Sequence, residues 1–184
     1  MIDPDDWLKW WRAGFVADIH KSWNELPWFS LNEQEKTIFY QDAPAVVRGL
    51  CNIPKTKLTE PDDRVLRFID FSPMRQQALT RLFAALCNCD FGYLSAHDQK
   101  WCDRITKGIR PQSFLPAGID YCEPQYHLSL LKSFFLPPVW SRLRLRFYQA
   151  DILLAEKDPL LFDSPYKKRL LALFDSALWR LDKS

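Results

Sequence analysis

Apolar residues recur along this chain every three or four positions, the spacing that places them on one face of a helix. After Pro73 this pattern includes Met74, Ala78, Leu79, Leu82, Phe83 and Leu86. After Pro165 it includes Leu170, Leu171, Leu173, Phe174, Ala177, Leu178 and Leu181. Only five glycines occur, and no Asn-Gly or Asp-Gly turn joins alternating runs, so hairpins are not indicated. The pattern predicts an all-α fold of about seven or eight helices.

Proline and small polar residues indicate where these helices begin. Proline suits the first helical position, because its missing N–H would have no partner there. Such starts are predicted at Pro4, Pro61, Pro73, Pro137-Pro138 and Pro165. Ser30 and Ser95, each followed by an acidic residue three positions later, resemble the start of a capping box. Gly108 predicts the end of the helix that begins at Ala96.

One segment permits two interpretations. Residues 142–147 alternate arginine with apolar residues, as a strand does, but residues 148–156 contain good helix formers and no breaker. The sequence therefore predicts one helix over residues 138–157. Proline-containing loops are expected near residues 53–61, 110–124 and 157–165.

Composition limits the class of protein. The 184 residues are 47% hydrophobic and 26% charged, which predicts one compact domain over residues 1–184, with residues 1–28 as a candidate peripheral helical segment. A net charge of +2 gives no overall field for nucleic acid or anionic lipid. Apolar runs of about 18 residues are absent, and the N-terminus lacks the character of a secretory signal. Five cysteines, an odd number, favour reduced thiols in a cytoplasmic protein.

The stretch from Ser95 to Pro111 offers the strongest candidate chemistry, since it places His97, Asp98 and Cys102 on one predicted helix. A cysteine nucleophile needs a base within hydrogen-bond reach. On a helix, His97 and Cys102 would point about 140° apart, so another histidine, His20 or His127, would have to approach Cys102 through tertiary folding. A small helical enzyme, or a thiol or metal protein, that uses Cys102 with His20, His97 or His127 is the alternative hypothesis.

Other motifs for chemistry are weak. Cys87 and Cys89 are separated by one residue and have no second pair, whereas structural zinc sites use wider spacings. A glycine-rich phosphate loop is also missing. The sequence thus predicts no catalytic residue, no cofactor and no metal site. A secretion chaperone is a further alternative, but chaperones of that class are usually acidic and dimeric.

Two segments are candidate partner-binding surfaces. Arg142, Arg144 and Arg146 would form a basic flank suited to an acidic partner. The three residues Trp7, Trp10 and Trp11 form an aromatic stripe at helical spacing, which would contact either a partner or the core of the protein.

Two motifs resemble the SctK proteins of bacterial type III secretion systems, also called YscK, OrgA or MxiK. The first includes Phe15, Ile19 and His20, followed by a tryptophan and Leu26-Pro27. The second is the segment Trp101-Cys102-Asp103-Arg104, followed by the proline-bounded segments 109–111 and 114–116. The sequence departs from the pattern near Ala17, where many relatives have proline.

This resemblance implies a cytoplasmic, non-enzymatic adaptor of the sorting platform. Such proteins join the cytoplasmic domain of the inner-membrane ring protein SctD to the pod protein SctQ, and through it to SctL and the ATPase SctN. It implies protein partners, with neither nucleic acid nor membrane insertion. Trp101, Cys102 and Arg104 would then be structural: Trp101→Ala is expected to cost roughly 3 to 5 kcal/mol as a core aromatic site, and Arg104 to hydrogen-bond nearby carbonyls or carboxylates.

Overall fold

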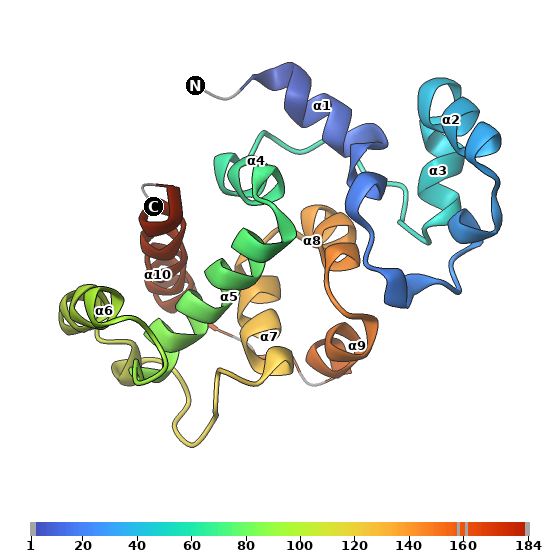
Figure 1. The fold of residues 1–184 in the computed structure, drawn as a ribbon. Helices are drawn as coiled ribbons and strands as arrows, with labels where there is room; N and C mark the ends of the chain where they lie inside the picture. The colour runs from blue at the N-terminus through green and yellow to red at the C-terminus, as the bar shows by residue number, and fades with distance from the viewer. Residues whose placement is uncertain (1–2, 158, 161, 183–184) are drawn as a thin grey trace. The chain divides into compact units, whose positions relative to one another are not determined.

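The computed structural model describes residues 3–157, 159–160 and 162–182 (Figure 1). These residues form ten α-helices, joined by loops and short 3₁₀ turns, and no strand. The all-α prediction is confirmed, with slightly more helices than the seven or eight expected. Contacts divide the chain into unit 1 (Met1–Leu66 and Phe135–Leu153) and unit 2 (Arg67–Phe134 and Leu154–Ser184). One domain over residues 1–184 stays a prediction.

Unit 1 is built from two separate parts of the sequence. Its elements are α1 (Pro4–Arg12), η1 (Gly14–Asp18), η2 (Lys21–Trp23), η3 (Pro27–Ser30), α2 (Glu33–Asp42), α3 (Pro44–Leu50), α8 (Pro137–Leu143) and η5 (Arg144–Arg146). The chain passes from one unit to the other within α4 (Asp63–Asp70), between Phe134 and Phe135, and within α9 (Gln149–Lys157).

The aromatic stripe of α1 belongs to the core of unit 1. Trp7, Trp10 and Trp11 are all buried, and the Trp7 ring lies 5.2 Å from that of Trp10 and 5.8 Å from that of Trp11. The Trp7 indole N–H donates a hydrogen bond to the carbonyl oxygen of Thr59 at 3.0 Å. Of the two contacts left open for this stripe, the one with the core is observed, and the partner-binding candidate is removed because the rings pack on one another and on the rest of the unit. The candidate peripheral segment 1–28 thus supplies core residues.

The predicted single helix over residues 138–157 is also wrong. It is divided into α8, η5 and α9, and Phe147 is extended with φ −100° and ψ 166°. The backbone at this break is bonded by a distant segment: the His20 N–H donates to the Leu145 carbonyl at 2.8 Å, and the Trp23 indole N–H donates to the Phe147 carbonyl at 3.0 Å. The Ser22 hydroxyl accepts from the Gln149 N–H at 2.8 Å. Tertiary hydrogen bonds therefore replace helical ones here.

The predicted basic flank is used inside unit 1. Arg142 is 1% exposed, its guanidinium lies 3.8 Å from the Trp11 ring centroid, and it donates to the carbonyls of Trp11 at 3.0 Å and Pro138 at 2.7 Å. Burial lowers the pKa of Arg142 to about 10. Arg144 lies over the Trp23 ring, and Arg146 pairs with Asp18. The flank is therefore not the open contact surface that was predicted.

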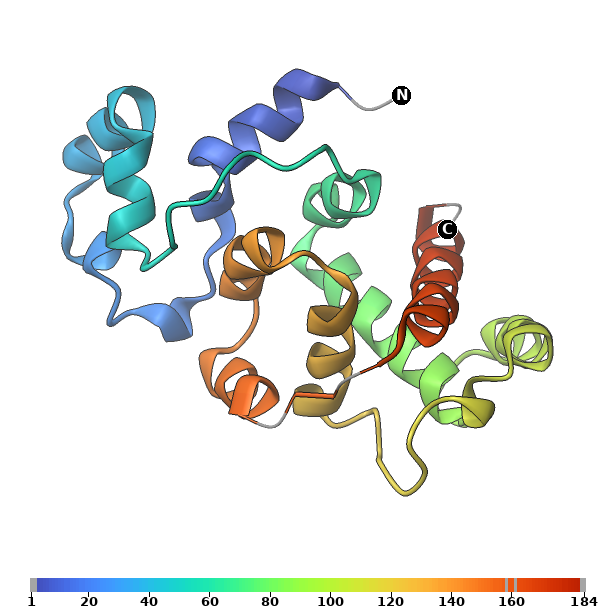
Figure 2. The same ribbon diagram turned by 180° about the vertical axis from the view of Figure 1, so that it is seen from behind.

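Unit 2 is built around its C-terminal helix, which packs against three others. Its elements are α5 (Pro73–Asn88), α6 (Ala96–Ile109), η4 (Pro111–Ser113), α7 (Pro124–Phe134) and α10 (Ser164–Asp182). α10 packs against α5, α6 and α7 (Figure 2). Phe83 lies edge-to-face with Phe174 at 5.6 Å and with Phe134 at 6.3 Å. Edge-to-face pairs of this kind add to the stabilisation from burial.

The predicted stripe of α5 is buried only in part. Leu79, Leu82, Phe83 and Leu86 are in the core, as the spacing indicated, but Met74 is 80% exposed. Ala78 is exposed as well. The first two turns of α5 therefore present apolar side chains to solvent.

Most predicted helix starts are confirmed, including Pro4, Pro73, Pro137 and Pro165. α4 begins at Asp63 rather than at Pro61. The capping box of α2 uses Asn32 and Glu35 in place of Ser30.

Two details concern helix ends and loops. α6 continues through Gly108 to Ile109, because Arg110 takes the left-handed capping conformation with φ 56°. Two residues of the loop expected over 157–165, Asp158 and Leu161, lie outside the described residues.

Candidate functional site

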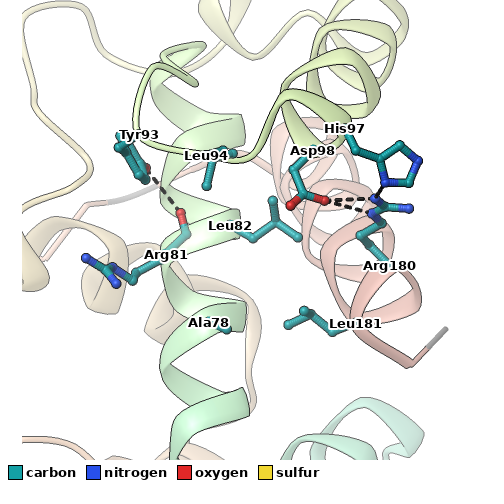
Figure 3. A pocket seen from close by; sticks show the side chains of 9 residues that line it. All are labelled: Ala78, Arg81, Leu82, Tyr93, Leu94, His97, Asp98, Arg180 and Leu181. Carbon is teal, nitrogen blue, oxygen red and sulfur yellow. Dashed lines mark hydrogen bonds and ion pairs between the residues drawn. The ribbon is translucent and has the colours of Figure 1, made fainter. Parts of the chain in front are cut away.

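The candidate site is a pocket of about 470 Å³ within unit 2, bordered by α5, α6, α10 and the loop before α6 (Figure 3). It includes the start of the stretch that carried the strongest candidate chemistry in the sequence. The residues that line it are Ala78, Arg81, Leu82, Tyr93, Leu94, His97, Asp98, Arg180 and Leu181.

One wall is a hydrogen-bonded charge cluster, which Figure 3 shows between α6 and α10. Arg180 donates to Asp98 Oδ1 from Nε at 3.1 Å and from Nη2 at 2.8 Å. The same Nη2 lies 2.6 Å from His97 Nδ1, which accepts when its ring carries the proton on Nε2. Ser95 Oγ donates to Asp98 Oδ2 at 2.7 Å. Both carboxylate oxygens thus have partners, and the cluster joins α6 to α10.

The electrostatics of Asp98 follow from these contacts. Its pKa is held below the ordinary value first by the hydrogen bond from Ser95 and then by Arg180. Asp98 is therefore a carboxylate at neutral pH, with its negative charge balanced by Arg180. This arrangement suits fixing two helices together better than moving a proton, since general acid–base catalysis favours a pKa near the working pH.

The floor of the pocket is apolar. Leu82 is 5% exposed, Leu94 and Leu181 are half-buried, and Ala78 is exposed. In Figure 3 Leu94, Leu82 and Ala78 lie between the charge cluster and the opposite wall, and Leu181 lies below Arg180. An apolar floor with a polar border is typical of a site that takes up another molecule's apolar group.

The opposite wall consists of Tyr93 and Arg81. The Tyr93 hydroxyl donates to the Arg81 carbonyl at 3.3 Å and lies 3.3 Å from Cys122 Sγ. The exposed guanidinium of Arg81 makes no ion pair or hydrogen bond within the described part of the chain. At the α10 end, Arg75 donates to the Leu181 carbonyl and lies 4.7 Å from the centroid of the Phe71 ring. Exposed positive charge therefore lies on this wall at Arg81 and, three residues before Ala78 on α5, at Arg75, which does not itself line the pocket.

Cys102 lies outside this pocket and is fully buried. Burial raises the pKa of its thiol to about 12, so it is protonated at neutral pH. His97 is bonded to Arg180, and His127 is buried beside the Tyr121 carbonyl. In unit 1, His20 Nδ1 lies 2.8 Å from Ser22 Oγ. Sequence reasoning left open an approach of one of these rings to Cys102, and none of the described contacts joins them.

The other cysteines of unit 2 form no evident ligand set. Cys87 is buried, Cys89 is half-buried and Cys122 is exposed. Among the described residues, no three His, Cys, Asp or Glu side chains are placed to hold a metal ion.

The residues of the family resemblance have different environments. Phe15 and Cys102 are buried, Ile19 and Trp101 are half-buried, and His20 is exposed. Because Trp101 keeps part of its surface in solvent, Trp101→Ala is expected to cost less than the 3 to 5 kcal/mol of a core site. Arg104 is exposed and makes no hydrogen bond among the described residues, so its predicted structural role is wrong.

Unit 1 contains a second hollow of about 420 Å³ beside α2. Ile19, Trp28, Phe29 and Tyr40 contribute apolar surface to it, and the paired charges Glu33 and Lys36 also border it. None of the residues of α2 is buried. Sequence reasoning did not find this hollow, because its lining combines 3₁₀ turns, which have no periodic pattern, with a helix that buries none of its residues.

Sequence reasoning found only part of the candidate site. His97 and Asp98 stood out because they lie in one turn near Cys102, whereas Arg81, Tyr93 and Arg180 are ordinary surface types without a local motif. Their meeting depends on how three helices pack.

Comparisons with known proteins give no assignment: no family model matches the chain, and neither the curated proteins nor the solved structures include a significant match. None of the described helices is both long and apolar enough to span a membrane.

Proposed function

We propose that this chain is a non-enzymatic helical adaptor that binds other proteins. The observation that carries the proposal is the open pocket of unit 2, with an apolar floor between a neutralised charge cluster and the exposed Arg81. The pocket offers a surface for binding, while its carboxylate is already bonded on both oxygens. Cys102, the leading candidate nucleophile, is a buried and protonated thiol. These features favour binding over catalysis.

In its specific form, the proposal is assembly of a type III secretion sorting platform, as in the SctK proteins. It would place the protein in the cytoplasm at the base of the injectisome, between an SctD-like ring domain and an SctQ-like pod protein, with indirect links to SctL and SctN. Support for this form comes from the resemblance around Phe15–His20 and Trp101–Arg104. The adaptor would thereby serve protein transport and virulence without a cofactor.

The test is co-purification from cytosol of cells that assemble a type III secretion apparatus, with the tagged chain as bait and bound proteins identified by mass spectrometry. Recovery of ring, pod and stalk proteins, absent from a tag-only control, is the expected result. Recovery of none of them would overturn the specific proposal. Repeating the experiment at low and moderate salt would show how far the contact depends on charge.

A further inference from the structure

We infer that the pocket of unit 2 receives an acidic amphipathic segment of a partner protein, with an apolar side chain on the pocket floor and carboxylates beside the arginines of α5. This inference rests on the proposed adaptor function and adds the chemistry of the partner. It concerns residues of α5, α6 and α10 that all belong to one unit.

The floor determines the apolar part of the partner. Ala78 exposes its side chain, and Leu94 and Leu181 keep part of their surface in solvent. Met74, one turn before Ala78, is 80% exposed. Covering this surface with an aliphatic or aromatic side chain would remove apolar area from water on both partners, which favours binding in proportion to the area covered.

The charged side chains around the pocket determine which charge the partner segment should carry. Asp98 is balanced by Arg180, and the neighbouring Asp182 is balanced by Arg67. Arg75 and Arg81 are exposed and make no ion pair within the described residues. Asp90, which also acts on Tyr93, accepts a hydrogen bond from the Gly92 N–H but keeps its negative charge, so one carboxylate stands against these two arginines. The rim therefore has an excess of positive charge that complements carboxylates.

The spacing on α5 determines the form of the partner. Arg75 and Arg81 are six residues apart, which is about 9 Å along a helix at 1.5 Å per residue. Ala78 lies midway between them. A matching segment would carry one apolar anchor with an acidic residue about three or four positions before it and another the same distance after it, on one face of a helix.

The experiment uses the full chain and a labelled helical peptide in which a central leucine has glutamates three and four positions away on both sides. A second peptide replaces every glutamate by lysine. Binding is measured by fluorescence anisotropy, and the site is mapped by NMR shifts of backbone amides. Saturable binding of the glutamate peptide, with shifts on α5 and at the start of α6, is expected, together with at least tenfold weaker binding of the lysine peptide. Equal affinity for the two peptides, or no saturable binding, would overturn the inference.

Variants of the chain test the site itself. Arg81→Glu and Ala78→Glu alter exposed side chains. Each is expected to weaken binding of the glutamate peptide about tenfold without lowering the melting temperature of the protein. Arg104→Glu is the matched control, since Arg104 is an exposed arginine of unit 2 that does not line the pocket. A similar loss in Arg104→Glu would show non-specific charge attraction and overturn the inference.

The failure of this inference differs from the failure of the proposed function. If Ala78→Glu still co-purifies with ring and pod proteins at the wild-type level, the adaptor proposal stands and the pocket inference is wrong. If no such protein is recovered with the wild type while the glutamate peptide binds as expected, the pocket inference stands and the secretion assignment is wrong.

Discussion

At the scale of single residues, surroundings rather than residue type decide what each arginine does. Arg142 lies in the core over Trp11 and serves the fold, whereas Arg81 has the same guanidinium in solvent beside a pocket. The sequence made Arg142 a candidate for partner binding because two further arginines, Arg144 and Arg146, lie close to it in the chain. Local spacing does not report the burial of a long side chain, which depends on what packs over it.

Arg142→Ala is expected to lower the free energy of unfolding by about 3 kcal/mol, because it removes a buried cation–π contact and leaves two carbonyls without their charged donor. Arg12→Ala, at an exposed arginine of the same unit, should change it by less than about 0.5 kcal/mol. Urea unfolding measures both values. If both variants lost similarly little free energy of unfolding, Arg142 would have to lie on the surface.

Asp98→Asn is expected to destabilise the protein by about 1 to 2 kcal/mol, since it weakens the bonds to Arg180 and Ser95 at a partly buried site. Asp103→Asn is the control on the same helix, because the Asp103 pair with Lys107 is exposed and such pairs contribute little. Thermal unfolding of the two variants makes the comparison. Equal losses of stability in the two variants would contradict the inference that the charge cluster of Asp98 and Arg180 holds α6 and α10 together.

His127 predicts a pH dependence of stability. Burial lowers its pKa in the folded protein, opposed by the bond to the Tyr121 carbonyl. The unfolded chain then binds a proton first as pH falls, so stability is complete above about pH 6.5 and decreases below it, by at most about 1.4 kcal/mol per pH unit. His127→Gln should lose less stability than the wild type between pH 7.5 and 5.5 in urea titrations. An equal loss of stability in both proteins over this pH range would show that His127 does not contribute to the pH dependence.

At the scale of elements, local signals located helix starts better than helix ends. Pro4 and Pro73 begin their helices and Ser95 caps α6 as the sequence indicated, since such start signals act within a few residues. The break at Phe147 escaped prediction, because its hydrogen bonds come from residues 20–23. Gly108 was misleading: the left-handed position falls on Arg110 instead.

Gly108→Ala is therefore expected to raise the free energy of unfolding by about 0.5 to 1 kcal/mol, because Gly108 is helical and an added Cβ meets nothing within 4 Å. Gly118→Ala has equal space but a φ of +80°, which alanine adopts at a cost, so it should be destabilising. Denaturant midpoints of the two variants should move in opposite directions. A loss in Gly108→Ala would show that the helix ends before that residue.

At the scale of the whole molecule, the helical class and much of the core follow from hydrophobic spacing, while the candidate site does not. Leu79, Leu82 and Phe83 could be assigned to the core from their period alone. The contact of Arg180 with Asp98 joins residues 82 positions apart, and no single-sequence pattern reports such a pair.

The five thiols provide a test of packing across the molecule. Cys51, Cys87 and Cys102 are buried, and burial raises the pKa of each, to about 12 for Cys51 and Cys102. A disulfide reagent at pH 8 should therefore modify Cys122 first and these three slowly, and all five rapidly in urea. Mass spectrometry of the modified peptides gives the order. Fast modification of Cys102 in the native protein would revive the thiol-enzyme hypothesis.

The two-part origin of unit 1 has a consequence for synthesis. Trp11 and Trp23 meet their partners Arg142 and Phe147 across 131 and 124 residues. A ribosome adding about 5 to 20 residues per second exposes the N-terminal tryptophans for many seconds before those partners emerge. The nascent chain would thus depend on chaperones until residues 137–149 leave the exit tunnel, and a chain shortened before them would leave these aromatic rings without their cover.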